Sequence, residues 1–216
     1  MQSIKISNLS VAYDGRSIIQ GFSLAVAAGE SILLKGPSGC GKSTILHAVC
    51  GLIPGSIEAE ISGEISLFGE NVQKLSVAER AGMLGIVFQN PETQLFCDSV
   101  EDEIAFGLEN LCIQRDEIAR RIDEMLALVG LAQHRAVSPS KLSGGQKQLV
   151  VLASVLALDP KILLLDEALS GLDEKGKQAL KARLATLKQE GRTLLMVDHE
   201  GMLETIADRV VDLERE

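Results

Sequence analysis

Glycines, a lysine and two hydroxyl residues stand at fixed spacing near position 40 of this chain. They form the run Gly36, Pro37, Ser38, Gly39, Cys40, Gly41, Lys42 and Ser43, followed by Thr44. Glycines at these spacings let consecutive backbone N–H groups turn toward phosphate oxygens, and a following helix N-terminus adds partial positive charge. In such loops the lysine reaches the β- and γ-phosphates and the next hydroxyl binds Mg²⁺. The run therefore predicts a site for a nucleoside triphosphate and Mg²⁺.

The segments around this loop favour the same interpretation. Residues 31–35 are almost entirely apolar and predict a short buried strand, and residues 44–50 predict a helix that ends at Gly51. A strand, a glycine-rich loop and a helix are the context in which this motif is specific. The alternative is a glycine-rich turn with no ligand, but it does not explain why the lysine and both hydroxyls fall in register.

Two carboxylates, Asp166 and Glu167, follow a second apolar run at residues 161–165. A strand that is apolar to its end and then carries two acids places them at the edge of an open α/β sheet where ligands bind. Asp166 suits the shell of Mg²⁺, which prefers oxygen ligands and retains waters. Glu167 can orient and deprotonate a water that attacks the γ-phosphate. An exposed acidic pair at a strand end is the alternative; beside a phosphate-binding loop we favour the hydrolytic interpretation.

A third motif begins an apolar helical run at residues 147–158. It is Leu142 followed by Ser143, Gly144, Gly145 and Gln146, with the serine at the expected N-cap. Adjacent glycines at a helix N-terminus permit close approach of an anion, although a serine and glycines can also simply start a helix. The five residues, between the phosphate-binding loop and Asp166, resemble the signature of the ATP-binding-cassette (ABC) family, and the resemblance covers nearly the whole chain.

The resemblance implies roles for four further residues. Tyr13 corresponds to the aromatic residue that stacks on adenine, and Gln89 to a glutamine that contacts Mg²⁺ and the attacking water. His199 corresponds to a histidine that contacts the γ-phosphate and positions the water, and Asp173 belongs to the D-loop. Taken alone, Tyr13 could be a surface aromatic, Gln89 a strand-exit residue and His199 a structural histidine. With the family order we expect Glu167, His199 and Gln89 to be catalytic.

In this family the ATP site forms between two cassettes packed head to tail. The resemblance implies that Ser143, Gly144, Gly145 and Gln146 act in trans, on the ATP held by the phosphate-binding loop of a second ABC ATPase subunit. That subunit is either a second copy of this chain or a related paralogue. ATP is then expected to close the dimer, and hydrolysis to release it.

The segments at residues 88–96 and 99–110, together with Lys147 and Gln148, are similar to the ATPases of energy-coupling-factor (ECF) transporters, which import vitamins or transition-metal ions. This similarity implies docking on a transmembrane scaffold subunit through the Q-loop and helical region, and an indirect link to a substrate-binding membrane subunit. A cassette of a conventional importer served by a binding protein is the alternative, and a soluble non-transport ABC ATPase is less favoured. Acidic residues at 98 and 101–103 are either a solvated helix start or contacts for basic scaffold residues.

Composition restricts the remaining function classes. The net charge is −9, and the 216 residues include no Trp and one Tyr, which argues against nucleic acid as a partner. The longest apolar stretch, residues 149–158, is too short to span a bilayer. The N-terminus lacks the layout of a signal peptide. The cysteines lack the spacing of a zinc site. We expect a peripheral protein at the cytoplasmic face of the cell membrane.

The pattern of elements predicts an α/β fold with three parts. Alternating apolar residues flank a hairpin turn at Asp14 and Gly15, whereas apolar residues from Ile118 to Val129 recur at helical spacing before Gly130. The predicted class is a P-loop NTPase core with a parallel sheet, an antiparallel β-subdomain and a helical subdomain, all within a single ABC ATPase domain at 1–216. The expected ranges are 1–30 and 59–72 for the antiparallel part, 31–58, 73–92 and 159–216 for the nucleotide-binding core, and 93–158 for the helical part with the signature.

Overall fold

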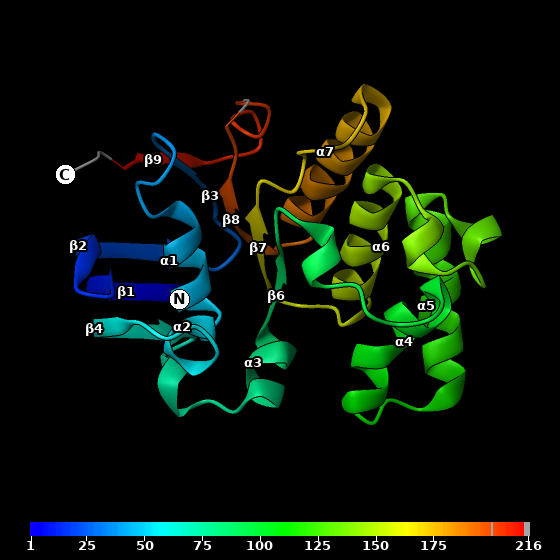
Figure 1. The fold of residues 1–216 in the computed structure, drawn as a ribbon, viewed down its shortest axis with the longest axis horizontal. Coiled ribbons are helices and arrows are strands. Elements are labelled where there is room, and N and C mark those ends of the chain that lie inside the picture. The colour runs from blue at the N-terminus through cyan, green and yellow to red at the C-terminus, as the bar shows by residue number, and fades with distance from the viewer. Residues whose placement is uncertain (200, 214–216) are drawn as a thin grey trace.

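The computed structural model describes residues 1–199 and 201–213 and arranges them around two sheets (Figure 1). Position 200 and the last three residues of the predicted range 159–216 lie outside the described residues. The first sheet is antiparallel and has the strand order β2-β1-β4-β5. Its strands are β1 (Gln2–Tyr13), β2 (Arg16–Ala27), β4 (Glu60–Leu67) and β5 (Glu70–Asn71).

The turn between β1 and β2 has the backbone that a tight hairpin needs. Asp14 and Gly15 have φ angles of 49° and 75°, and Tyr13 pairs with Arg16 across them. Two consecutive residues with positive φ match the right-handed twist of the flanking strands, and Asp-Gly is a preferred pair for this geometry. The hairpin therefore fixes where Tyr13 leaves the sheet.

The second sheet is parallel, with the order β6-β7-β8-β3-β9. Its strands are β3 (Ser31–Lys35), β6 (Leu84–Val87), β7 (Ile162–Asp166), β8 (Thr193–Val197) and β9 (Arg209–Asp212). Every residue of β7 and β8 is buried, which is why these strands are continuous apolar runs. With both sheets and the helices present, the predicted fold class is confirmed.

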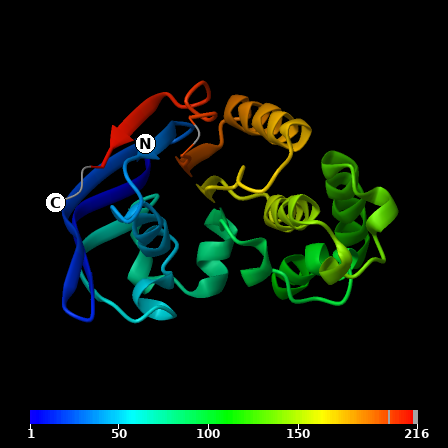
Figure 2. The same ribbon diagram turned by 45° about the horizontal axis from the view of Figure 1, so that its top comes forward.

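Helices cover both faces of the parallel sheet, as Figure 2 shows. Alternate residues of β3 divide between two cores, because Ile32 and Leu34 pack on the side of α1 (Lys42–Val49) and Leu33 packs on the opposite side. That opposite side carries α6 (Gly144–Ala157) and α7 (Glu174–Gln189). The sheet thus holds the phosphate-binding loop and the signature helix on different faces.

A third core joins α6 to α4 (Val100–Asn110) and α5 (Arg115–Val129), at the right of Figure 1. Helix α5 ends at Gly130 with φ 69°, as its sequence predicts. The short helices α2 (Leu52–Gly55) and α3 (Val77–Met83) connect the two sheets. The division of the chain into subdomains at the ranges given above stays a prediction.

Two of the acidic residues at the start of α4 make contacts with other residues of the same chain. Glu103 is only 5% exposed, and its Oε2 accepts hydrogen bonds from the backbone N–H groups of Phe96 at 3.0 Å and Cys97 at 2.9 Å. Glu101 forms an ion pair with Arg135 at 2.6 Å. Glu103 is therefore neither a solvated residue nor a free contact for a partner: it holds the segment that leads into the helices.

Candidate nucleotide-binding site

The loop between β3 and α1 needs its glycines for steric reasons. A Cβ on Gly41, which has φ 94°, would lie 2.2 Å from Cδ1 of Ile19, and a Cβ on Gly36, with φ 144°, would lie 2.4 Å from the carbonyl oxygen of Leu213. Both φ angles also disfavour a side chain. The loop is thus a backbone surface with α1 starting directly behind it.

Lys42 begins α1, and its side chain folds back over the loop. Its Nζ donates to the carbonyl oxygens of Gly36 at 2.8 Å and Pro37 at 2.9 Å, and the residue is 5% exposed. Cys40 is buried beside it, with Sγ 3.8 Å from Nζ. These contacts hold the ammonium group at the floor of the loop, where phosphate oxygens would meet it.

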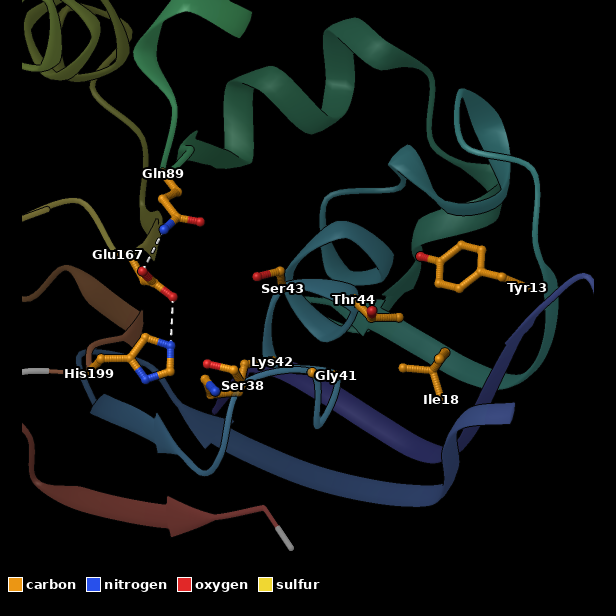
Figure 3. A pocket seen from close by; sticks show the side chains of 11 residues that line it. Tyr13, Ile18, Ser38, Gly41, Lys42, Ser43, Thr44, Gln89, Glu167 and His199 are labelled. Carbon is orange, nitrogen blue, oxygen red and sulfur yellow. Dashed lines mark hydrogen bonds and ion pairs between the residues drawn. The ribbon is translucent and has the colours of Figure 1, made fainter. Parts of the chain in front are cut away.

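A pocket of about 480 Å³ opens above this loop, and Figure 3 shows its side chains. Its lining consists of Tyr13, Ile18, Ser38, Gly39, Gly41, Lys42, Ser43, Thr44, Gln89, Glu167 and His199. Gly36, Pro37 and Cys40 stand behind the lining and support Lys42. Tyr13 and Ile18 lie at one end of the pocket in Figure 3, and Gln89, Glu167 and His199 lie at the other, with the phosphate-binding loop between them.

Strand register explains why the three polar side chains meet. In the parallel sheet Val87 of β6 pairs with Leu165 of β7, so Gln89 and Glu167 each follow two residues later on neighbouring strands. Asp166 pairs in turn with Val197 of β8, just ahead of His199. Because the carboxyl ends of parallel strands share one edge of the sheet, residues far apart in the sequence converge there.

Glu167 has a polar partner at each carboxylate oxygen. Nε2 of Gln89 donates a hydrogen bond to Oε2 at 2.7 Å, and Nε2 of His199 lies 2.7 Å from Oε1, within ion-pair distance (Figure 3). Glu167 also has φ 49°, in the left-handed region that such residues seldom adopt, and strain of this kind clusters at functional sites. Its backbone N–H bonds to the carbonyl of Val197 at 3.0 Å, which holds the turn in place.

Ser43 and Asp166 bring two oxygens together below the pocket. The hydroxyl of Ser43 donates to Oδ1 of Asp166 at 3.0 Å, and Asp166 is 4% exposed. Burial raises the pKa of Asp166, while the Ser43 hydrogen bond and the charge of Lys42 act in the opposite direction. A hard divalent cation would stabilise the ionised form, so this pair of oxygens fits Mg²⁺. Among the described residues, no group of three or more His, Cys, Asp or Glu side chains could hold a metal. A cation here would thus keep positions for water and phosphate oxygens.

Two residues of the site region were not predicted from the sequence. Ile18 of β2 forms the pocket wall beside Tyr13. In the sequence, its place on the strand that pairs with the strand of Tyr13 was the feature that could have indicated this position. Asp198 is 6% exposed, and its Oδ2 accepts from the backbone N–H of Leu203 at 2.9 Å. It fixes the turn that carries His199.

The signature lies on α6, outside this pocket. Ser143 caps the helix: its Oγ accepts from the N–H of Gln146 at 3.3 Å, while Oε1 of Gln146 accepts from the N–H of Ser143 at 3.0 Å. A Cβ on Gly144 would have no neighbour within 4 Å among the described residues, and one on Gly145 would make only ordinary contacts. Packing within this chain therefore does not require either glycine. Asp173 of the D-loop caps α7, with Oδ1 2.7 Å from the N–H of Gly176.

Comparison with known proteins agrees with this geometry. The sequence model of the ABC transporter family matches residues 19–170. The chain belongs to the ABC transporter family. It is 41% identical over 214 residues to the energy-coupling factor transporter ATP-binding protein EcfA1 of Leuconostoc mesenteroides, covering 98% of this chain and 77% of that protein. A relative in Methanosarcina acetivorans is 42% identical over 215 residues, and this chain spans 98% of its own length but only 34% of that protein.

Two solved structures of ABC proteins share the fold. The CbiO1 protein of Clostridium perfringens, part of the ABC transporter complex cbiONQ, superposes with a TM-score of 0.82 at 30% identity, covering 98% of this chain and 84% of that one. An ATP-binding cassette solved as a dimer, in a post-hydrolysis state bound to ADP and Pi, gives 0.88 at 25% identity, with 99% and 96% covered. Among the described residues, none of the helices combines the length and apolarity needed to cross a bilayer.

Proposed function

We propose that this chain binds ATP with Mg²⁺ and hydrolyses it to ADP and phosphate, as the ATP-binding subunit of an ABC-type membrane transporter. One observation carries the proposal. The phosphate-binding loop and the polar trio at the strand ends line one pocket, and Asp166 is hydrogen-bonded to Ser43 of that lining. Family membership supports the reaction, and the geometry supports the roles of the residues.

The two ends of the pocket suggest the orientation of the nucleotide. Tyr13 offers an aromatic face for adenine at one end, and Ile18 adds apolar surface. Backbone N–H groups from Gly39 to Ser43 and the ammonium of Lys42 would hold the phosphates in the middle. The γ-phosphate would then face Glu167. Ser43 and Asp166, with Gln89, would hold Mg²⁺, which neutralises charge on the phosphate oxygens when bound.

Glu167 is suited to act as the general base. Its carboxylate is placed at the γ-phosphate end of the pocket, and its two oxygens are oriented by Gln89 and His199. In the reaction it would accept a proton from water, and the water oxygen would bond to phosphorus while the bond to the ADP oxygen breaks. Gln89 and His199 would then donate hydrogen bonds to the water and the γ-phosphate oxygens.

A second ABC ATPase subunit would complete the site. Ser143, Gly144, Gly145 and Gln146 lie outside the lining of the pocket of their own chain, and the open surface at Gly144 suits approach by a nucleotide held on another subunit. The dimeric cassette with ADP and Pi is a relative in which two subunits pair. In a dimer of this chain, or with a related paralogue, ATP would bind the closed form more tightly and shift the population toward it.

The transporter is proposed to be of the ECF type, importing a vitamin or a transition-metal ion. The likeness to EcfA1 and to CbiO1 supports this class. The segment after Gln89 and the helices α4–α6 would contact a transmembrane scaffold subunit, which joins this chain indirectly to a substrate-binding membrane subunit. The chain would then lie peripherally at the cytoplasmic face of the cell membrane.

Purification of the tagged chain from its own membranes tests the proposal. We expect a scaffold subunit and a small substrate-capturing membrane protein to co-purify. A permease pair dependent on a separate binding protein would overturn the ECF class. Phosphate release with Mg-ATP should exceed that of Lys42→Ala, which loses the phosphate contact. A wild-type rate equal to that of Lys42→Ala would overturn the hydrolytic function.

A further inference from the structure

The signature helix touches the segment of Gln89 through a buried glutamine. Gln148, the fifth residue of α6, is 2% exposed, and its Nε2 donates to the carbonyl oxygen of Phe88 at 3.2 Å. Phe88 directly precedes Gln89. The N–H of Phe88 donates to Oε1 of Gln94 at 2.8 Å, so its peptide groups are held from both sides. The position of Gln89 therefore depends on a side chain of α6.

An ion pair crosses the same junction at the surface. Nζ of Lys147 lies 2.5 Å from Oε1 of Glu92, with the lysine 15% and the glutamate 66% exposed. Adjacent residues of α6 thus contact the chain on both sides of Gln89, at Phe88 and at Glu92. The signature ends one residue earlier, at Gln146, so movement of the signature and of the Gln89 segment is linked over a very short distance.

Stability does not explain why residue 148 is an amide. Its Oε1 is buried and has no hydrogen-bond partner among the residues that the structure describes. A buried acceptor without a donor destabilises a fold, and such groups are uncommon in native proteins. A methionine has a similar length and would fill the same space without the unpaired oxygen. Among the described residues, the hydrogen bond of the amide is the one to the carbonyl oxygen of Phe88.

We propose that Gln148 is a positioning residue, which couples the signature helix to Gln89. The inference rests on the proposed function and deepens it. In a dimer, the signature of each subunit would serve the partner's ATP while Gln89 serves the ATP of its own. When the signature closes on the partner's nucleotide, α6 shifts the Phe88 carbonyl through Gln148 and so moves Gln89 relative to Glu167, to which it is already hydrogen-bonded in the single chain. Closure at one site then prepares hydrolysis at the other.

The test compares Gln148→Met with Ser154→Ala in the complex purified from membranes. Ser154 is on the same helix, and its hydroxyl donates to the carbonyl oxygen of Val151 in its own turn at 2.9 Å, which makes it a matched control. For Gln148→Met we expect kcat to fall about tenfold, because Gln89 is misplaced, while KM for ATP stays within about twofold. The Hill coefficient for ATP should fall from above 1 toward 1. The midpoint of thermal unfolding should not decrease.

Three results would overturn the coupling. The first is a Hill coefficient of 1 in the wild-type complex. The second is a Gln148→Met complex whose kcat and Hill coefficient equal those of the wild type. The third is a Gln148→Met complex with a lower unfolding midpoint and with kcat and KM both impaired, because that result indicates a structural role. If Gln148→Met does not fold, Lys147→Met breaks the surface ion pair instead, and an unchanged Hill coefficient there also counts against coupling. Failure of the proposed function is distinct, because the wild-type complex would then release no phosphate.

Discussion

Replacing Glu167 by glutamine should separate ATP binding from hydrolysis. The carboxylate accepts a hydrogen bond from Gln89 on one oxygen, and Nε2 of His199 lies 2.7 Å from the other. Glutamine has the same shape, and the amide of Gln89 can rotate to present its oxygen to the new NH₂ group. The side chain of residue 167 therefore keeps its place, but it no longer takes a proton from water.

The expected loss follows from the role of a general base. Positioned bases contribute about 100- to 10,000-fold to a rate, which corresponds to about 2.7 to 5.4 kcal/mol of activation free energy. Binding should change little, because the proposed phosphate contacts come from Lys42 and the loop, not from Glu167. ATP that binds without being hydrolysed should hold the proposed dimer closed.

Three measurements on one preparation check this prediction. Phosphate release gives the rate, binding of a fluorescent ATP analogue gives affinity, and light scattering with Mg-ATP gives the mass of the particle. Glu174→Gln is the matched control, since Glu174 is 80% exposed at the start of α7 and outside the pocket. A Glu167→Gln rate within about threefold of wild type would refute the assignment of the base, since removal of a general base lowers a rate by at least about 100-fold.

Two further predictions concern residues outside the pocket. Glu103→Leu should lower the free energy of unfolding by about 2 kcal/mol, because the N–H groups of Phe96 and Cys97 lose their acceptor. Glu103→Gln keeps an acceptor oxygen and should lower it by under about 1 kcal/mol. Equal urea midpoints for the two variants would contradict this prediction. Burial raises the pKa of the Cys50 and Cys97 thiols to about 11, so less than about 2% of either is thiolate at pH 9. Iodoacetamide at pH 8 should therefore label exposed Cys112 first, and equal labelling of Cys97 in peptide mass spectra would contradict the raised pKa of its thiol.

Strands buried on both faces were the elements most readily predicted from the sequence. Residues 32–34 and 194–197 are continuous apolar runs, and the structure places them in β3 (Ser31–Lys35) and β8 (Thr193–Val197). β9 was missed because Arg209–Asp212 is an edge strand without a fully buried residue, so it has no apolar run. Helix α3 was missed for the same reason, although its capping box at Ser76 and Glu79 was a signal in the sequence.

The parts of the site that depend on residues close together in the sequence were also easier to predict than those that depend on residues far apart. The phosphate-binding loop is local, so its spacing alone predicted its place after a strand. The contact of Ser43 with Asp166 joins residues 123 positions apart, and that of Gln89 with Glu167 joins residues 78 apart. The motifs predicted Ser43, Asp166 and Glu167, and family order predicted Gln89, but only the strand order of the parallel sheet shows why they touch. Gln148 acts on a distant backbone carbonyl, and such a contact leaves no motif in the sequence.

The site also has a part whose position is set mainly by the sheet and a part whose position depends on a helix as well. Glu167 and His199 follow strands β7 and β8, which are buried throughout and paired with each other, so the sheet is the main determinant of where their backbones lie. Gln89 follows β6 as well, but the chain after it enters the helices, and α6 holds the peptide before it. Gln89 is therefore the member of the trio whose position responds to both the sheet and the signature helix. A change in the rate of hydrolysis that originates at the signature should accordingly be transmitted through Gln89, with Glu167 and His199 remaining fixed.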